Sequence, residues 1–428
     1  MKTCATVLVV LAGALAGTAA AENWPQWRGP ALNGSTTETG LPAKFSATEN
    51  VIWSADLPGI GGATPIVWGE NVFVSAMEPD SKKLWAVCLG AADGKVRWKL
   101  PMGEGFTNKM GNTGASPSPI TDGKTVWFYY GSGRLAATDL SGKVLWQRNI
   151  QEDHGEFEIL WAYASSPLLY EGRLYIPVLH AEVRKADRDI SYLLCVDPAT
   201  GKDIWKCPRI TDAKGESRQA FITPFPLAGK GGWQVLIHGG DYLTGHDPAD
   251  GKMLWKSSDY NPSKNMWWRT VPSAVGADGV AVGYAPKGGR MFAVRAEAGD
   301  GKPAGSDLWQ TRYNSPDVCT PLIYRGRLFV LDGRKKELVC MDLKTGQVHW
   351  KGDLPAKAVF QASATGADGK VYCINLDGEA VVASAGDSFE VLHHVAMGGK
   401  NCRSTIAAAN GRLFLRTDTK LYCIGKAR

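Results

Sequence analysis

The chain has 428 residues and a formal net charge of +6, with 44% hydrophobic and 21% charged residues. This balance excludes wholesale disorder, and the positive charges are spread along the chain rather than gathered into an arm that would bind nucleic acid. After residue 20 no stretch approaches the roughly 18 apolar residues that a membrane span needs. We therefore predict a globular protein with no nucleic-acid partner and no membrane span.

The chain begins with the features of a secretory signal peptide over residues 1–21. Lys2 precedes a short apolar run over residues 5–17, and small residues follow up to Ala21. The run is too short for a membrane anchor, and Cys4 precedes it, whereas the cysteine of a lipoprotein follows the run. We expect cleavage near Ala21 and export to the periplasm or beyond.

From residue 51 onward one phrase recurs: a hydroxyl residue, a Gly turn, an aromatic-aliphatic run, and then Asp-x-x-(Thr/Asp)-Gly-Lys-x-x-Trp. It is clearest over residues 139–146, 197–205, 247–255 and 342–350. The repeat tryptophans recur at intervals of about 40–60 residues, at Trp53, Trp98, Trp146, Trp205, Trp255, Trp309 and Trp350. A period of this length is typical of propeller blades.

Each repeat contains four short runs that alternate apolar and polar residues, separated by Gly, Asp or Pro turns, as expected for four strands. In the turn, Asp caps the backbone, Gly takes the positive φ, and Lys begins the outer strand. The Trp on that strand is then placed to cover the seam to the next blade.

The two ends of the repeat region complement each other. The last repeat has three strands and no closing strand, and the strand that carries Trp53 has no partners upstream. Joining them removes an open sheet edge. We therefore predict an all-β fold: an eight-bladed β-propeller of four-stranded antiparallel blades over residues 51–428, with the last blade closed by the N-terminal Trp53 strand.

The preceding segment, residues 22–50, is polar and rich in Gly and Thr, with three large side chains, Trp24, Trp27 and Phe45. We expect an extended segment that lies along the propeller surface and is held by those rings. The sequence leaves open whether it plugs the central channel or wraps the rim.

Alignment of the repeats argues against a disulfide framework among the cysteines. The residue two before the turn Asp is small in every repeat, and in four repeats it is Cys88, Cys195, Cys340 or Cys423. Equivalent positions in a ring are far apart, so we expect these four to be free, buried thiols. Pairing among the others remains open: Cys207, Cys319, Cys373 and Cys402.

The repeat resembles the tryptophan-docking motif of the pyrroloquinoline-quinone (PQQ)-like β-propeller superfamily. The opening Trp24-Pro-Gln-Trp27-Arg28-Gly29-Pro30 resembles the N-terminal segment of exported bacterial members. That superfamily includes quinoprotein alcohol and glucose dehydrogenases. It also includes a non-enzyme, the propeller subunit of the outer-membrane β-barrel assembly machinery.

The chain departs from both kinds of relative. It has no adjacent Cys pair, no Cys-x-x-Cys-His for an attached haem, and no acidic and amide group that matches the Ca²⁺ site of the dehydrogenases. It also lacks the lipid-bearing Cys of the assembly subunit. We therefore predict no cofactor and no metal, and PQQ with Ca²⁺ belongs to the alternative hypothesis.

In a propeller the loops from each outer strand to the next inner strand converge on one face, at the mouth of the channel. Their polar and aromatic residues are the candidate ligand-binding set, and no catalytic residue is assigned. The set could hold an anionic planar ligand or an extended peptide. Its members are Lys109, Asn112, Glu156, Trp161, Arg218, Gln219, Trp268, Arg269, Asp317, Gln361, Asn401 and Arg403.

Structural roles are the alternative for several of these. Trp161 and Trp268 could pack between blades, and the arginines could pair with Asp317 or with glutamates inside the channel. His154 with its neighbouring glutamates could be a metal pair, although a solvated turn is the simpler interpretation.

Three functions follow. The first, which we favour, is a non-catalytic exported binding or scaffold protein, a monomeric propeller that holds a protein, peptide or small ligand on its channel face. The second is a PQQ-binding quinoprotein-type oxidoreductase that acts on alcohols or sugars. The third is a secreted hydrolase or lyase in which Glu156, Glu158 and Asp317 carry out acid–base chemistry.

Overall fold

The runs of alternating apolar residues form strands, and the Gly and Asp turns end them. In the sixth repeat the strands are β24 (Leu322–Tyr324), β25 (Arg327–Asp332), β26 (Glu337–Asp342) and β27 (Val348–Asp353). Each pairs antiparallel with the next. This is the blade that the sequence predicts.

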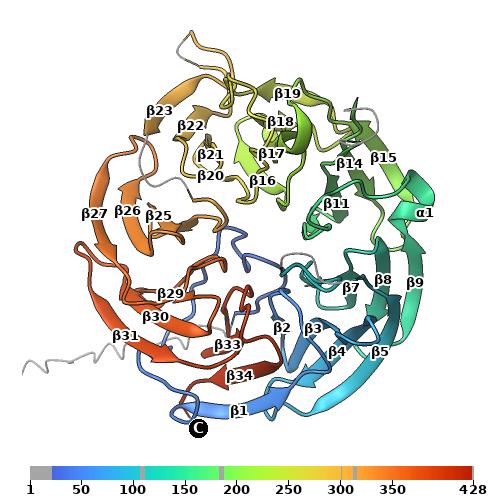
Figure 1. Ribbon diagram of the computed structural model, residues 1–428, viewed down its shortest axis with the longest axis vertical. Coiled ribbons are helices and arrows are strands. Elements are labelled where there is room, and N and C mark those ends of the chain that lie inside the picture. Colours follow the sequence, from blue (N-terminus) through green and yellow to red (C-terminus); the bar gives the residue numbers. More distant parts are fainter. Residues whose placement is uncertain (1–21, 107–110, 183–187, 300, 312–315, 427–428) are drawn as a thin grey trace, which may run out of the picture.

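The computed structural model describes residues 22–106, 111–182, 188–299, 301–311 and 316–426. Within them, eight four-stranded antiparallel sheets form a ring (Figure 1), which confirms the eight-bladed propeller. The predicted signal peptide, residues 1–21, lies outside the described residues. No helix in these ranges is long and apolar enough to cross a membrane.

The blades follow one another in chain order. Blades 1 and 2 are β2 (Ile66–Trp68), β3 (Asn71–Met77), β4 (Lys83–Gly90) and β5 (Val96–Glu104), then β6 (Ile120–Thr121), β7 (Thr125–Tyr129), β8 (Arg134–Asp139) and β9 (Val144–Asn149). Blades 3 and 4 are β10 (Leu168–Tyr170), β11 (Arg173–Val178), β14 (Tyr192–Val196) and β15 (Asp203–Pro208), then β16 (Phe225–Gly229), β17 (Gly232–Gly239), β18 (Tyr242–His246) and β19 (Met253–Lys256).

Blade 5 is β20 (Val275–Ala277), β21 (Val280–Tyr284), β22 (Met291–Arg295) and β23 (Asp307–Thr311), and blade 6 is β24 to β27. Blade 7 is β28 (Thr365–Ala367), β29 (Lys370–Ile374), β30 (Glu379–Ser384) and β31 (Val391–Ala396). Outside the blades are a two-stranded sheet of β12 (Ala181–Glu182) and β13 (Arg188–Asp189), the helix α1 (Ile150–His154) and a 3-10 helix over Gly215–Arg218.

Blade 8 joins the two ends of the chain. It consists of β32 (Ala407–Ala409), β33 (Arg412–Arg416), β34 (Lys420–Ile424) and β1 (Val51–Asp56). β1 pairs antiparallel with β34, with Trp53 opposite Cys423 (Figure 1). The closure by the Trp53 strand is therefore confirmed.

The repeat tryptophans join neighbouring blades. Trp98 Nε1 donates to Leu140 O of the next blade at 2.9 Å, and five of the other repeat tryptophans donate to the equivalent turn in their next blade. Trp255 differs, because its Nε1 donates to Gln234 Oε1 of its own blade at 2.6 Å. The seam between blades 4 and 5 therefore lacks this indole hydrogen bond.

The column of small residues lies directly across the sheet from these tryptophans. The pairs are Cys423–Trp53, Cys88–Trp98, Ala137–Trp146, Cys195–Trp205, Gly245–Trp255, Ala293–Trp309 and Cys340–Trp350. At Gly245 an added Cβ would lie 2.3 Å from Trp255 Nε1. A small side chain in this column thus leaves room for the indole on the neighbouring strand.

Two glycines with similar backbone torsions allow the cost of disturbing the tryptophan contact to be measured apart from the cost of backbone strain. Gly346 (φ 71°) would bring a Cβ to 2.7 Å from the Trp309 ring, whereas Gly326 (φ 72°) faces open space. We expect Gly326→Ala to cost about 1 kcal/mol of unfolding free energy and Gly346→Ala about 1–3 kcal/mol more. Urea denaturation of both variants measures the difference, and equal costs would contradict the docking role of this turn.

A ring of side-chain hydroxyls links the entries to the inner strands. Six hydrogen bonds of one kind form this ring, and in each a backbone N–H donates to a side-chain hydroxyl of a neighbouring blade at 2.9–3.2 Å. These are Thr64 to Ser118, Ser118 to Ser166, Thr223 to Ser273, Ser273 to Thr320, Thr320 to Ser363 and Thr405 to Thr64. The recurring Ser or Thr therefore ties neighbouring blades together around the channel.

The N-terminal segment, residues 22–50, crosses the ring and binds several inner strands. The backbone of Trp24 pairs with Val67, and the Gln26 amide exchanges two hydrogen bonds with Leu169 at 3.0 and 3.1 Å. Further along, Ser35 pairs with Gly366. The segment thus reaches blades 1, 3 and 7.

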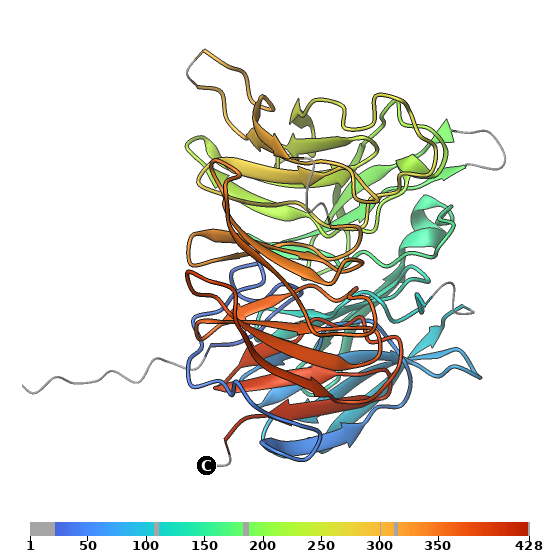
Figure 2. The same ribbon diagram turned by 60° about the vertical axis from the view of Figure 1, so that its left-hand side comes forward.

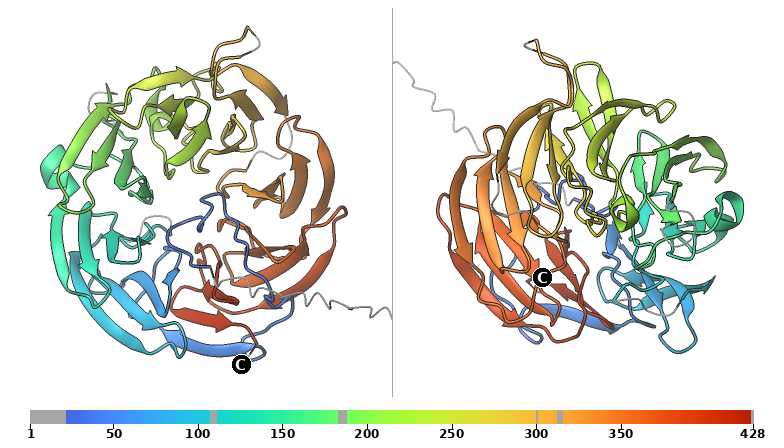
Figure 3. Two further views of the ribbon diagram at one scale, coloured as in Figure 1. Left: turned by 180° about the vertical axis from the view of Figure 1, so that it is seen from behind. Right: turned by 45° about the horizontal axis from the view of Figure 1, so that its top comes forward.

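This segment closes one end of the channel. Figure 3 shows it in blue across the centre of the ring, and in Figure 2 it lies on the opposite side from α1. Trp24 and Phe45 are buried, and residues after Ser35 continue outward until His393 Nε2 hydrogen-bonds Phe45 O. The segment therefore both plugs the channel and runs along the rim.

The cysteines of the described residues are unpaired. All eight are free thiols, and every one except Cys207 is buried. Burial raises the pKa of the Cys88 thiol to about 12 and that of Cys340 to about 11. These thiols therefore stay protonated at neutral pH and act as small apolar side chains.

Candidate functional site

The central channel forms a cup of about 490 Å³. Its walls come mainly from the loops that join each outer strand to the next inner strand, and Trp27 of the N-terminal segment lines it as well. Because that segment closes the opposite end, a ligand would enter from the loop face. The volume lies within the range of pockets that hold small molecules or a few residues of a peptide.

One wall carries a carboxylate between an indole and a guanidinium. Glu216, on the 3-10 helix, is buried and accepts a hydrogen bond from Trp161 Nε1 at 2.5 Å. Arg269 Nε lies 3.7 Å from the same oxygen, Oε1. The Glu216 charge is therefore compensated by Arg269, and the Trp161 indole fixes its orientation.

The opposite wall holds a second arginine. Arg403 Nε donates to Asn401 Oδ1 at 2.9 Å and its Nη1 donates to Asn112 Oδ1 at 3.1 Å. Asn112 Nδ2 in turn donates to Trp161 O at 2.8 Å. Burial lowers the pKa of Arg403. The two amides therefore orient this guanidinium.

A third group of charges lies on the blade 5 and blade 6 side. Asp317 is 4.0 Å from Arg334 Nη1, and Asp317 Oδ1 accepts a hydrogen bond from the backbone N–H of Lys287 at 3.2 Å. The Lys287 side chain is exposed, and both cations line the cup. Four cationic side chains and two carboxylates therefore line the described part of the cup.

Gln361 contributes an unused acceptor to this lining. Its Oε1 is buried and has no hydrogen-bond partner among the described residues. A buried amide oxygen without a partner is costly, and a ligand N–H would satisfy it. Several of the ring hydroxyls, including Ser118, Ser166 and Thr320, line the cup as well.

The structure brings six of the twelve candidate residues together in the cup. These are Asn112, Trp161, Arg269, Asp317, Gln361 and Arg403. The interpretation of Trp161 as simple inter-blade packing does not describe it fully, because its ring lines the cup and its Nε1 holds Glu216. Lys109 lies outside the described residues.

Five candidates do not line the cup, so the sequence placed them too near the channel. Gln219 is buried and binds backbone groups of Leu160 and Glu158 in the preceding loop, and Arg218 Nε donates to Ala213 O at 2.8 Å. Asn401 does not line the cup itself, but its Oδ1 accepts a hydrogen bond from Arg403, which does.

Trp268 and Glu156 are the other two candidates that do not line the cup. Trp268 packs against the apolar cluster between blades 4 and 5, which is the packing role that the sequence left open. Glu156 is exposed and does not line the cup. Arg269, next to Trp268, lines the cup in its place, whereas Phe157, next to Glu156, stacks on Tyr163.

Three charged lining residues and the ring of Trp27 were not among the candidates. Lys287 and Arg334 lie in the turns between the second and third strands of their blades, and Glu216 lies in a loop from which other residues were chosen. A signal was available, because the second and third strands of an antiparallel sheet turn on the same face as the inter-blade loops. Trp27 was expected only as an anchor.

The donor set does not fit a Ca²⁺ site. Calcium prefers six to eight oxygen ligands, including carboxylates, but the only carboxylates of the described lining, Glu216 and Asp317, are each beside an arginine. Within the described ranges no three His, Cys, Asp or Glu side chains gather in a way that could hold a metal ion.

The fold and this cup define a class: an eight-bladed propeller with tryptophan docking and a polar, mixed-charge hollow at one end of its channel. The family described as "Outer membrane protein assembly factor BamB" matches residues 35–187 and 301–427. The chain belongs to this family of PQQ-like propellers. No curated protein sequence matches it.

Solved structures share the fold at low identity. BamB from Moraxella catarrhalis is 13% identical with a TM-score of 0.59, covering 88% of this chain and 98% of that one. The quinohemoprotein alcohol dehydrogenase of Comamonas testosteroni is 14% identical with a TM-score of 0.63, covering 95% and 81%. The designed protein Ika8 is 10% identical with a TM-score of 0.59, covering 87% and 98%.

Proposed function

We propose that this chain is an exported, non-catalytic scaffold propeller that binds a peptide segment of a partner protein in the cup. The observation that carries the proposal is the charge of the described lining, where four cationic side chains, the exposed Lys287 among them, face two carboxylates, Glu216 and Asp317, that each lie beside an arginine. Such a lining attracts an acidic ligand, and neither of its described carboxylates is without an arginine beside it.

Two further features support a peptide. The unpartnered Gln361 oxygen would accept a backbone N–H, and the ring hydroxyls would bind backbone carbonyls. The family is named for an outer membrane protein assembly factor, which favours a protein partner and an exported location. We propose a monomeric propeller, because the ring closes on itself.

The test measures binding of linear peptides to the purified mature chain. Ten-residue peptides selected from a random library are labelled with fluorescein and titrated by fluorescence polarisation. We expect Arg334→Glu together with Lys287→Glu to weaken binding at least tenfold, because the cup then repels acidic ligands. Lys95→Glu is the matched control, since Lys95 is 84% exposed on the perimeter of blade 1.

The same assay addresses the quinoprotein alternative, which the two indoles and the arginines of the cup favour. PQQ is added as a competitor, with and without Ca²⁺, and the desalted protein is scanned for retained absorbance. Stoichiometric retention of the quinone would favour that alternative. Selected peptides that bind the double variant as tightly as the native chain would refute the proposed role of the cup.

A further inference from the structure

A second hollow lies beside the cup, between blades 4 and 5. It is a groove of about 700 Å³ formed by the loop after β19, the β21–β22 turn and strand β23. Its lining consists of Tyr260, Pro262, Trp268, Ala285, Gly288, Gly289, Arg290, Gln310 and Thr311. No carboxylate is among these residues.

The groove and the cup share a wall. Trp268 lines the groove and Arg269 lines the cup, and likewise Gly288 lines the groove and Lys287 lines the cup. Consecutive residues on two separate loops thus face both hollows. We call the junction marked by Arg269 and Lys287 the saddle. A Cβ added at Gly288 would meet nothing within 4 Å, so the groove is open at this point.

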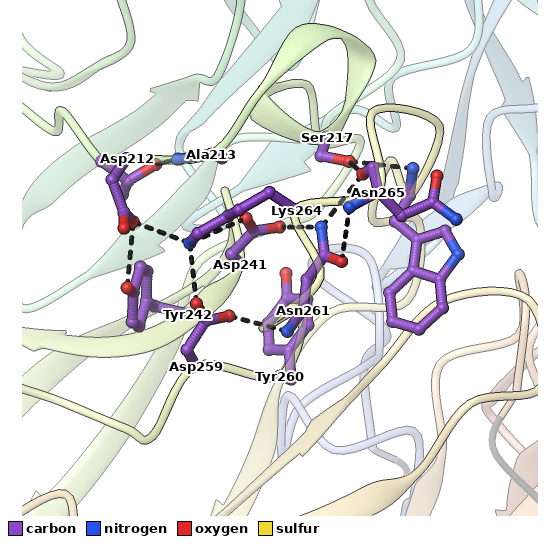
Figure 4. A network of polar contacts seen from close by, with 12 residues as sticks. Asp212, Ala213, Ser217, Asp241, Tyr242, Asp259, Tyr260, Asn261, Lys264 and Asn265 are labelled. Atoms are coloured by element: carbon purple, nitrogen blue, oxygen red, sulfur yellow. Dashed lines mark hydrogen bonds and ion pairs between the residues drawn. The ribbon is translucent and has the colours of Figure 1, made fainter.

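The loop that forms one side of the groove is held firmly by polar contacts. Asn261 is fully buried, its Nδ2 donates to Asp241 Oδ1 at 3.0 Å, and its Oδ1 accepts from the backbone N–H of Asn265 at 2.9 Å. Lys264 Nζ lies 3.0, 3.4 and 2.7 Å from carboxylate oxygens of Asp212, Asp241 and Asp259 (Figure 4).

This network reaches the neighbouring loop and presents apolar side chains to solvent. The backbone N–H of Trp268 donates to Ser217 Oγ at 2.9 Å. Met266 and Trp267 are 45% and 59% exposed at the tip of the loop. A rigid loop that displays a large exposed ring has the character of a binding surface, because little side-chain entropy is lost on contact.

The chemistry of the groove suits one occupant. Pro262, Trp268 and Ala285 supply an apolar surface. The cationic groups at the saddle and in the wall are Arg269, which lies beside Glu216, and Lys287 and Arg290. Arg290 is held by Gln310 Oε1 at 2.7 Å and by Asp259 O at 2.9 Å, contacts that leave its charge in place. Asp259 turns its carboxylate to Lys264.

We propose that the groove is a second subsite of the binding face, and that it takes an extended acidic segment of the partner. An apolar side chain packs on Pro262 and Trp268, a carboxylate lies over the saddle, and the segment continues into the cup. This inference rests on the proposed function and names the chemistry and path of the peptide. The groove gives the acidic segment a direction, outward between blades 4 and 5.

The test uses two synthetic probes, the peptide GEGEFGEGEG and its matched lysine version GKGKFGKGKG, each labelled with fluorescein. We expect the acidic peptide to bind the mature chain and the basic one to bind at least tenfold more weakly. Pro262→Glu and Gln310→Glu change exposed positions of the groove, and each should weaken the acidic peptide about tenfold. Lys95→Glu should not change its affinity.

A second measurement locates the peptide directly. The Phe is replaced by benzoylphenylalanine, and crosslinks are mapped by mass spectrometry; we expect them within residues 260–268 or 285–290. If Arg334→Glu abolishes binding but the two groove variants do not, and crosslinks fall only in the cup, the groove proposal is wrong and the proposed function stands. If neither probe binds although library peptides do, the acidic assignment is wrong.

Discussion

Replacing Arg28 with Met is expected to lower the free energy of unfolding by about 3–5 kcal/mol, because each buried carbonyl that loses its donor costs about 1–3 kcal/mol. Arg28 is buried in the N-terminal segment. Its guanidinium donates to Ala364 O at 2.8 Å, to Pro321 O at 2.8 Å and to Asn33 O at 3.0 Å. The first two bonds tie the segment to blades 6 and 7, so in the variant two buried carbonyls and one partly buried carbonyl lose their donor.

Equilibrium urea denaturation of the mature chain measures this loss, and limited proteolysis of residues 22–36 reports whether the plug has loosened. Arg97→Met is the matched control, because Arg97 is 39% exposed and lies 3.5 Å from Glu70, which is 87% exposed. We expect less than about 1 kcal/mol for the control. A similar small loss for Arg28→Met would show that the plug does not depend on this side chain.

Acidification below pH 6.5 is expected to destabilise the fold steeply. Burial lowers the pKa of His180, His238 and His246 to about 4 each. His238 and His246 lie in blade 4, and His180 lies in the loop that follows β11. His238 shows why: its Nδ1 hydrogen-bonds Pro272 O and its Nε2 accepts from the backbone N–H of Tyr284, an arrangement that only the neutral ring allows.

The direction in which stability changes with pH follows from proton binding. Between pH 6.5 and 4 the unfolded chain binds protons at these histidines and the folded chain does not, so stability falls as the pH falls. Above pH 6.5 their contribution is constant. Each histidine contributes up to roughly 3 kcal/mol over this window. Asp241, whose pKa burial raises to about 6, acts in the opposite direction below that pH and offsets part of the loss.

Urea denaturation at pH values from 4.5 to 8 measures the profile. His246→Asn keeps a donor for Gly251 O and removes one titrating ring, so we expect its stability to fall less steeply with acid. His349→Asn, at an exposed position, should leave the profile unchanged. A native profile that is flat from pH 6.5 to 4.5 would contradict the neutral burial of these rings.

The repeat was predictable because its determinants are local. The Asp-x-x-Thr-Gly-Lys turn and the strand alternation each act within about ten residues, so the sequence alone predicts the strands, and counting copies predicts eight blades. The column of small residues two positions before the turn Asp could be found from the sequence in the same way. The need for small side chains there could not, because Cys340 and Trp350 face each other only when their two strands pair.

The candidate site was predictable only in part. Arg269, Asp317 and Arg403 follow from the rule that inter-blade loops converge on the channel. Within those loops the rule cannot say which side chain turns inward, and Gln219 turned toward the preceding loop instead. Lys287 and Arg334 reach the cup from turns that the rule does not include.

The sequence alone predicts the propeller, its closure by the Trp53 strand, and the face proposed to hold a binding site. The closure of the channel by the N-terminal segment follows from the tertiary structure, since Gln26 and Arg28 bind partners 143 and 336 residues away. It also decided the charge of the cup and the groove beside it. Such contacts depend on how loops that are distant in the sequence pack against one another, and a repeat pattern does not specify that packing.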